Sequence, residues 1–510
     1  MYLNKIKLTL ACIIITGFVF TGCTEEEIND QGDKDNQEET NDQEDTNDQE
    51  NTPGVTVETM NANIFAKYVL ETYYYWNEEI SKDLNKLDPQ KNSDPIATVE
   101  EIRYHDETNQ IDKWTMLTNN MDEFTSSVQG VSTTYGYTPI IYRLSDTPNE
   151  LVAAVAFVSE NSPAEKAGLK RGDLIYKIDG ATLTLDNYLD LFYSSQIKLS
   201  LAKLVGNKIT PTGELSLAAV EMYENPILCD SVYNFNGKKV GYLAYSSFDL
   251  QSIPELINTC KMFKNEGIKE LILDLRYNGG GYVITENVLA SMFAPQVNVT
   301  NKDIFEKEDY NDFFTEYYKQ EGISTITKFE TEYNYNEIDL NVSTKDANIG
   351  LEKIYGIITA NSASASEALL SGLMPYMDIE LIGKQSHGKY CTGWMLAAKD
   401  VYQTVPQSIK DWGIYVMVSI YKNAEDKTPC MPNGLTPNVE AEDNPMEAYQ
   451  LGDENEAMLK VALQRAGKVY TETRSGETFT SGLKMVDTPK KAVFGRRIII
   501  PSQSEMPGIE

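Results

Sequence analysis

The feature that most constrains the fold is an alternation of apolar strand-like runs with a helical segment in the second half of the chain. Residues 239–245 (KVGYLAY) and 268–275 (IKELILDL) are strand-like, and residues 253–263 between them have the pattern of a helix. Such a strand–helix–strand order is typical of an α/β core.

The same alternation returns further along the chain. Residues 351–360 are strand-like, a short helix with Leu369, Leu370 and Leu373 on one face follows, and residues 379–382 form another strand-like run. The polar, tyrosine-rich residues 298–350 are predicted to interrupt this core.

Residues 361–367, NSASASE, join the strand-like run to the short helix. The start of a helix offers backbone N–H groups and a partial positive charge, so a serine here could attack a carbonyl while nearby amides stabilise the oxyanion. The three glycines at 279–281, which follow the strand-like residues 268–275, are a second source of unhindered amides. The alternative interpretation is that a serine only caps the helix.

A nucleophilic serine needs a base. The chain has two histidines, and of these only His387 lies in this region, so a Ser-His-Asp triad would have to use it. The alternative base is a lysine that burial keeps neutral, and Lys384 and Lys389 lie in the same glycine-containing segment. At this point both kinds of base remain open.

Residues 162–180, SPAEKAGLKRGDLIYKIDG, predict a short helix that stops at Gly168, a strand at 174–178 and an Asp-Gly turn. This order resembles the PDZ domains of bacterial proteases. The resemblance implies that an extended peptide is added to a sheet edge, with its carboxylate held by backbone N–H groups. Gly136 and Tyr137 are the expected peptide-binding residues, although Pro139 nearby lacks an N–H donor.

Three further motifs carry a resemblance to one family. NSASASEALLSG, the later GKQSHGKY and the earlier LDLRYNGGG resemble the C-terminal processing peptidases, or tail-specific proteases, over residues 57–467. These are serine endopeptidases with a PDZ domain ahead of a crotonase-like α/β core. The resemblance implies Ser364 as nucleophile and Lys389, 25 residues later, as general base. It also implies the amides of Ala365 and of Gly279 or Gly280 as oxyanion donors, without a metal or cofactor.

The sequence departs from the family pattern after the lysine. Gly393 stands where many members have a glutamine that orients the base, and His387 stands where many have an aromatic residue. Either Gln385 or Gln403 is expected to hold Lys389 instead, or the activity is reduced. The alternative function is therefore a protein- or peptide-binding lipoprotein on the same fold, with weak or lost protease activity.

The N-terminus has the pattern of a secretory signal. Lys5 and Lys7 precede the apolar residues 8–20, and Thr21 and Gly22 precede Cys23. The pattern resembles a bacterial lipoprotein signal with lipidation at Cys23, and the alternative is an ordinary cleaved signal. The expected location is the cell envelope, anchored by lipid to the outer membrane and facing either the periplasm or the cell surface.

Charge and composition bear on the partners of the chain, on its tether and on its cysteines. The formal net charge of −33 argues against nucleic acid as a partner, and thirteen acidic residues against one lysine between residues 24 and 52 predict an extended acidic tether. Cys229, Cys260, Cys391 and Cys430 are expected to be buried thiols, with disulfide pairing as the alternative. The predicted divisions are a signal peptide (1–22), the tether (23–56), a helical domain (57–130), a PDZ domain (131–206), the peptidase core (207–446) and a C-terminal extension (447–510).

Overall fold

The computed structural model describes residues 53–107, 109–144, 149–205, 208–447, 449–470, 483–486, 488, 495–502 and 505–506. The predicted signal, Cys23 and nearly all of the acidic tether lie outside these residues. Within the described ranges, no helix is both long enough and apolar enough to cross a bilayer.

The first described segment is mainly helical. Helix α1 begins after Thr56, whose hydroxyl accepts a hydrogen bond from the backbone N–H of Thr59, and it buries Phe65 and Val69. The predicted helical domain, residues 57–130, also includes a strand, β1, which pairs with β21 of the core. The elements are α1 (Val57–Thr72), η1 (Asp83–Lys86), α2 (Pro95–Ile102), β1 (Met116–Thr118) and α3 (Met121–Val128).

A separate antiparallel sheet follows, in the order β23-β3-β4-β5-β7-β8 with β6 beside β5. Ser162 caps α4 by accepting from the backbone N–H of Glu165, as the start of the predicted short helix requires. The elements are β2 (Val131–Thr134), β3 (Tyr137–Arg143), β4 (Leu151–Val158), α4 (Pro163–Lys166), β5 (Leu174–Ile178), β6 (Ala181–Thr182), α5 (Asp190–Tyr193), β7 (Gln196–Val205), β8 (Lys208–Ala218), β9 (Val220–Tyr223) and β23 (Lys484–Met485).

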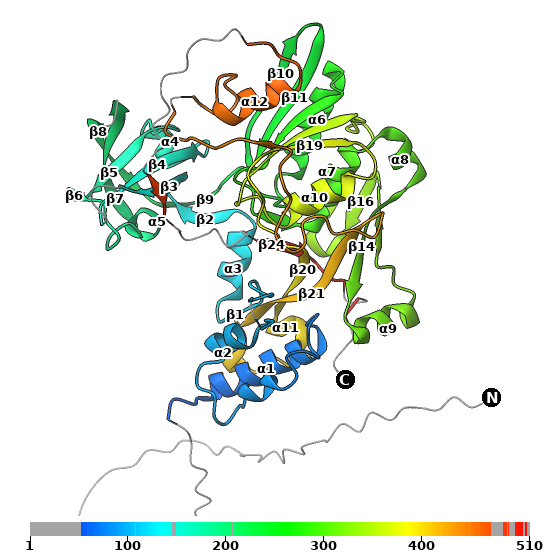
Figure 1. Ribbon diagram of the computed structural model, residues 1–510. Helices are drawn as coiled ribbons and strands as arrows, with labels where there is room; N and C mark the ends of the chain where they lie inside the picture. Colours follow the sequence, from blue (N-terminus) through cyan, green and yellow to red (C-terminus); the bar gives the residue numbers. More distant parts are fainter. Residues whose placement is uncertain are drawn as a thin grey trace, which may run out of the picture. The chain divides into compact units, whose positions relative to one another are not determined.

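The core contains the predicted alternation of strands and helices. Its first sheet has the order β10-β11-β12-β18-β19-β22, and every pair from β11 to β22 is parallel. Helices α7 and α10 pack against each other beside this sheet (Figure 1). The elements are β10 (Ile227–Phe235), β11 (Lys238–Tyr245), α6 (Ile253–Glu266), β12 (Glu270–Asp274), α7 (Val283–Phe293), β18 (Lys353–Ile358), α10 (Ala365–Leu373), β19 (Asp378–Gly383), β22 (Val439–Glu440) and α12 (Ala457–Arg465).

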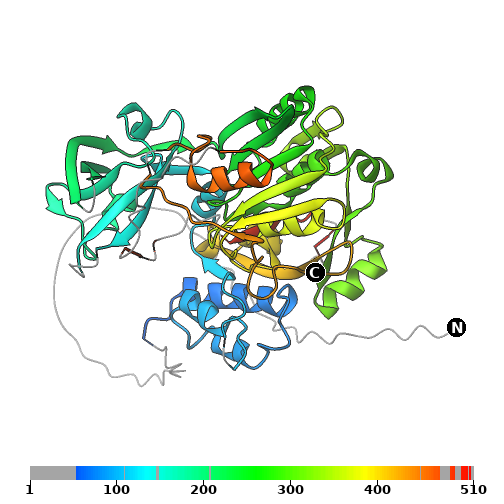
Figure 2. The same ribbon diagram turned by 45° about the horizontal axis from the view of Figure 1, so that its top comes forward.

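A second core sheet has the order β13-β24-β20-β21-β14-β15, with β1 paired to β21. Residues 298–350 separate α7 from β18 as expected, and they also contribute β14, which pairs with β21 in this second sheet. Figure 2 shows the same strands from a second direction, and β24 pairs with β13 on one side and with β20 on the other. The elements are β13 (Gly280–Tyr282), α8 (Gln296–Asn301), β14 (Ile304–Tyr310), α9 (Asp312–Glu321), β15 (Ile326–Lys328), β16 (Glu332–Tyr335), η2 (Asn336–Ile338), β17 (Leu340–Ser343), β20 (Cys391–Ala397), α11 (Ala398–Val401), η3 (Gln407–Ile409), β21 (Gly413–Asn423) and β24 (Arg496–Ile499).

The parallel pairing of β12 with β18 brings two predicted loops together. Both strands end at the same edge of the sheet, so the glycine loop after β12 and the serine loop after β18 become neighbours. The backbone N–H of Ala363 donates to the carbonyl of Asn278 at 3.0 Å, which ties one loop to the other. The four cysteines of the described chain are unpaired, and three of them are buried.

Candidate active site

Ser364 lies immediately before α10 in a strained backbone conformation, with φ 66° and ψ −115°. Positive φ is uncommon for a non-glycine residue and persists where the surroundings enforce it, often at functional sites. The side chain is buried, and its Oγ has no hydrogen-bond partner among the described residues. The hydroxyl is therefore not used as the helix cap that the alternative interpretation required.

Glu367 provides the restraint on this serine. One carboxylate oxygen accepts from the backbone N–H groups of Ser364 and Lys389, each at 2.9 Å. The other accepts from the backbone N–H of Gly388 at 2.7 Å and from the Ser386 hydroxyl. Burial raises the pKa of Glu367 to about 7 against the opposing effect of these bonds. A single carboxyl group thus holds the serine loop and the lysine segment together.

Lys389 is fully buried, and its Nζ donates to the hydroxyl of Tyr415 at 3.0 Å. The same Nζ lies 5.2 Å from the ring centroids of Trp114 and Tyr415. Burial lowers the pKa of Lys389 to about 7, because desolvation disfavours the ammonium form. A large fraction of this amine is therefore neutral near pH 7 and able to accept a proton.

The partner of Lys389 Nζ differs from the two glutamines proposed from the sequence. Gln385 donates instead to the carbonyl of Asn433 at 2.6 Å, and the lysine is held by Tyr415 from β21. Gly393 makes this possible, since a methyl group there would lie 2.5 Å from the Tyr415 ring. The missing glutamine side chain leaves the space that the tyrosine ring occupies.

The other candidate bases are placed differently. Lys384 is partly exposed and pairs with Glu440 and Glu442. The His387 ring is half-buried and meets the Trp114 ring edge-on at a centroid distance of 6.2 Å. Lys389 is the buried amine of this segment and the one whose backbone is tied directly to the serine loop.

Two of the predicted oxyanion donors, Ala365 and Gly280, lie beside Ser364. Ala365 is the first residue of α10 and is buried, and Gly280 approaches so closely that a methyl group on it would lie 2.8 Å from Ser364 Cβ. The N–H of Gly280 already donates to Asn278 Oδ1 at 2.9 Å. The geometry therefore favours Gly279 over Gly280 as the second donor.

The backbones of Ser364 and Lys389 meet on Glu367, but the Ser364 hydroxyl and the Lys389 amine are not hydrogen-bonded to each other. The lysine points to Tyr415, and the tyrosine hydroxyl in turn contacts the backbone of Arg497 in β24. A Ser-Lys hydrogen bond would require Lys389 Nζ to leave Tyr415, and the four-carbon stem of lysine is flexible.

The predicted peptide-binding residues Gly136 and Tyr137 lie where β3 begins in the antiparallel domain. The N–H of Gly136 donates to Thr134 Oγ1 at 3.0 Å, and the Tyr137 side chain is buried. The edge of β3 is covered by β23, whose Lys484 pairs with Arg143. The structure does not bring this region together with Ser364.

Sequence reasoning missed Glu367 and Tyr415. Glu367 was visible as the acid that ends NSASASE, three residues after the serine, where a capping glutamate accepts a backbone N–H. Tyr415 gave no signal of this kind, because it lies 26 residues beyond the lysine and approaches it across β20 and β21.

Two regions of the chain match models of known protein families. Residues 239–441 match the model of peptidase family S41, and residues 155–202 match that of the PDZ domain. The carboxyl-terminal-processing protease of Synechocystis sp. is 24% identical over 245 residues, which cover 47% of this chain and 49% of that protein. The carboxy-terminal processing protease CtpA of Bacillus subtilis is 26% identical over 262 residues, 50% of this chain and 47% of that protein.

The match to these relatives is partial, since the chain spans about half of the length of each. Among solved structures, a Bacteroides fragilis NCTC 9343 protein classed as an S41 protease superimposes with a TM-score of 0.61 at 23% identity. That superposition covers 79% of this chain and 96% of the other, and it shows a shared fold.

Proposed function

We propose that the chain, whose residues 239–441 match the model of peptidase family S41 and follow a region that matches a PDZ domain, is a serine endopeptidase of the cell envelope. It cleaves proteins or peptides through an acyl-enzyme intermediate. Ser364 is the nucleophile and Lys389 is the general base.

The observation that carries this proposal is the way Glu367 joins the two residues. It holds the strained backbone of Ser364 and the backbone of Lys389 on one carboxylate oxygen. The Ser364 hydroxyl has no hydrogen-bond partner among the described residues, and the Lys389 amine has a pKa of about 7 because it is buried. A structural serine at a helix start would instead use its hydroxyl as the cap.

The reaction follows from these positions. Neutral Lys389 accepts the hydroxyl proton of Ser364 as Oγ attacks the peptide carbonyl. The amides of Ala365 and Gly279 stabilise the oxyanion at the start of α10. Protonated Lys389 then gives the proton to the leaving amine, and water activated by the same lysine hydrolyses the ester.

One observation supports the alternative, a binding protein on this fold. Lys389 Nζ is bonded to Tyr415 and not to the Ser364 hydroxyl. If the lysine never leaves the tyrosine, the protein binds peptides without cleaving them. Hydrolysis measurements separate these two functions.

The test is hydrolysis of an unstructured protein, casein, by the full chain and by four folded variants. Ser364→Ala, Lys389→Ala and Lys389→Arg should each lose at least roughly a hundredfold in rate, since arginine keeps the charge but cannot accept the proton. His387→Phe is the matched control and should retain most activity. An inactive His387→Phe beside an active Lys389→Arg would reverse the assignment of the base.

The envelope location rests on the sequence of the N-terminus. We propose that Cys23 is lipidated and anchors the protein to the outer membrane, with the acidic tether holding the peptidase away from the surface. Cys23→Ala should release the protein from the membrane fraction. Membrane association and processing equal to those of the wild type would refute the anchor.

A further inference from the structure

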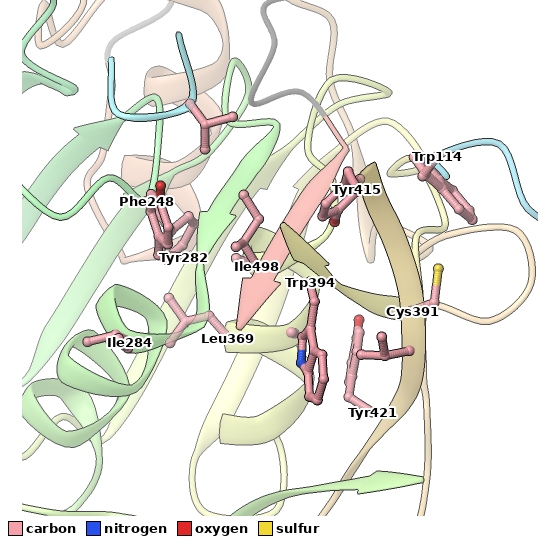
Figure 3. Packing of buried hydrophobic residues seen from close by; sticks show 14 of the residues in the cluster. Trp114, Phe248, Tyr282, Ile284, Leu369, Cys391, Trp394, Tyr415, Tyr421 and Ile498 are labelled. Atoms are coloured by element: carbon pink, nitrogen blue, oxygen red, sulfur yellow. The ribbon is translucent and has the colours of Figure 1, made fainter. Parts of the chain in front are cut away.

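Strand β24, close to the C-terminus, runs through the proposed active site. It pairs in parallel with β13, which continues the glycine loop, and with β20, which follows Lys389. Just before β24, the N–H of Gly495 donates to the carbonyl of Gly279 at 2.7 Å. In Figure 3 Ile498 of this strand lies among Tyr282, Trp394 and Tyr415, and it is fully buried.

The peptide unit between Arg496 and Arg497 faces the catalytic groups. A methyl group on Gly280 would lie 2.4 Å from the Arg496 carbonyl oxygen and 2.8 Å from Ser364 Cβ, so the oxygen and the serine converge on the same point. The N–H of Arg497 donates to the Tyr415 hydroxyl at 3.1 Å, and that hydroxyl also accepts from Lys389 Nζ. The peptide unit that joins Arg496 and Arg497 therefore lies between Ser364 and the tyrosine hydroxyl that binds Lys389.

The side chain of Arg497 fills a closed acidic pocket made by Glu286, Glu306 and Glu308. Its Nε donates to Glu286 at 2.9 Å, and its two terminal nitrogens donate to Glu306 and Glu308. The guanidinium carbon also lies 4.6 Å from the centroid of the Tyr421 ring. Planar, bidentate recognition of this kind is specific to arginine, with lysine as a weaker substitute.

The pocket is more acidic than its occupant is basic. Three carboxyl groups surround one guanidinium, and Glu306 Oε2 is buried without a hydrogen-bond partner. Burial raises the pKa of Glu306 to about 7 and that of Glu286 well above its usual range, with Arg497 opposing the shift. The pocket thus sets three carboxyl groups against one guanidinium, and two of the three hold a proton more tightly than usual.

A second segment of the same C-terminal region also occupies a peptide position. Strand β23 pairs antiparallel with β3, and the N–H of Val486 donates to the carbonyl of Ile141 at 2.8 Å. This is the kind of sheet edge to which PDZ domains add an extended peptide. Both peptide-accepting edges of the molecule are thus covered by residues after 482.

We propose that β24 occupies the substrate groove as a peptide substrate would, and that Glu286, Glu306 and Glu308 form the subsite that selects arginine or lysine at the residue after the scissile bond. The proposal rests on the peptidase function proposed above. It names the substrate class as extended peptides with a basic residue at that position, which compete with β24 for the groove.

The test measures binding, so that it does not depend on hydrolysis. The full-length double variant Ser364→Ala, Arg497→Ala is mixed with a fluorescein-labelled peptide of residues 495–502, GRRIIIPS, and fluorescence anisotropy is recorded. The peptide should bind, and replacing its second arginine by methionine should weaken binding at least about tenfold, as expected for loss of a charged hydrogen-bonded partner. A peptide with methionine in place of Ile500 is the matched control and should bind as the parent does.

The Ser364→Ala variant with its own Arg497 intact should bind the parent peptide at least about tenfold more weakly, because β24 fills the groove. Equal binding by the two proteins, or equal affinity for the arginine and methionine peptides, would overturn the proposal.

A second measurement covers the case in which Arg497→Ala does not fold. The wild-type chain is incubated with a mixed peptide library, and the products are sequenced by mass spectrometry. Arginine or lysine should follow the cleaved bond at least about tenfold more often than methionine does, and Glu308→Gln should reduce this preference. Cleavage without such a preference refutes the subsite alone, whereas a complete lack of cleavage and of Ser364 labelling by a fluorophosphonate refutes the peptidase function.

Discussion

Replacing Lys389 by methionine should make the protein more stable while abolishing its activity. Lys389 is fully buried, and the residue that holds its Nζ is the neutral Tyr415. Methionine has a similar length and no charge to desolvate, so the substitution removes the base and the penalty for burying it.

The magnitude follows from the pKa. Burial lowers it from 10.5 to about 7, and each pKa unit corresponds to about 1.4 kcal/mol, so keeping this amine buried costs about 4–5 kcal/mol near pH 7. Loss of the hydrogen bond to Tyr415 offsets about 1 kcal/mol. Lys389→Met should therefore raise the free energy of unfolding by about 3 kcal/mol at pH 7.

The pH dependence has a defined sign. The folded pKa of Lys389 is below the unfolded value, so between pH 7 and about 10.5 the unfolded chain binds more protons and the wild type gains stability as pH rises. The advantage of the methionine variant should be largest at pH 7 and below and should shrink toward pH 10. Urea unfolding of both full-length proteins at pH 6, 7, 8.5 and 10 measures this difference. A difference that does not change with pH, or a destabilised methionine variant at pH 7, would refute a desolvated, neutral lysine.

Three further substitutions test the surroundings of the pair. Tyr415→Phe removes an acceptor that favours the ammonium form of Lys389. The value of kcat should therefore fall about three- to tenfold, and the acidic limb of the pH–rate profile should move to lower pH. An unchanged profile would contradict the contact. Glu367→Gln places an amide donor against backbone N–H groups, so it should destabilise the protein by about 2–4 kcal/mol. It should also lower kcat more than it changes KM. Equal stability of the variant and the wild type in thermal denaturation would contradict the role of Glu367. Gly280→Ala puts a methyl group against Ser364, so it should abolish labelling of the serine by a fluorophosphonate and lower the free energy of unfolding by about 1–3 kcal/mol. Normal labelling would contradict the close approach of Gly280 to Ser364.

The parts of the fold that follow from local pattern could be predicted from the sequence. The apolar run at residues 174–178 coincides with β5, and the helix expected after NSASASE is α10. The pairing of Ser364 with Lys389 was predicted from the family resemblance and from their spacing in the chain. In the fold, the backbones of both residues are bonded to the same glutamate, Glu367. Runs bounded by turn residues and caps are specified by interactions between residues close in sequence.

The parts that depend on long-range pairing could not be predicted. The polar residues 298–350 include β14, whose buried Glu306 and Glu308 both pair with Arg497, a residue nearly 200 positions later in the chain. The absence of a glutamine at Gly393 was visible, but its consequence required the register of β20 against β21, which sets Tyr415 beside that glycine. Sequence patterns indicate which residues are buried or polar and do not identify their partners across a sheet.

The most direct test of the central claim is the rate at which a fluorophosphonate labels Ser364 as a function of pH, with the modified residue located by mass spectrometry. An active Ser364–Lys389 pair predicts labelling at Ser364 alone, at a rate that rises through about pH 7 and then levels off as Lys389 loses its proton. Lys389→Arg should not label at any pH in this range, and His387→Phe should follow the wild type. Labelling that persists in Lys389→Arg, or that falls on a different serine, would contradict the assignment of nucleophile and base.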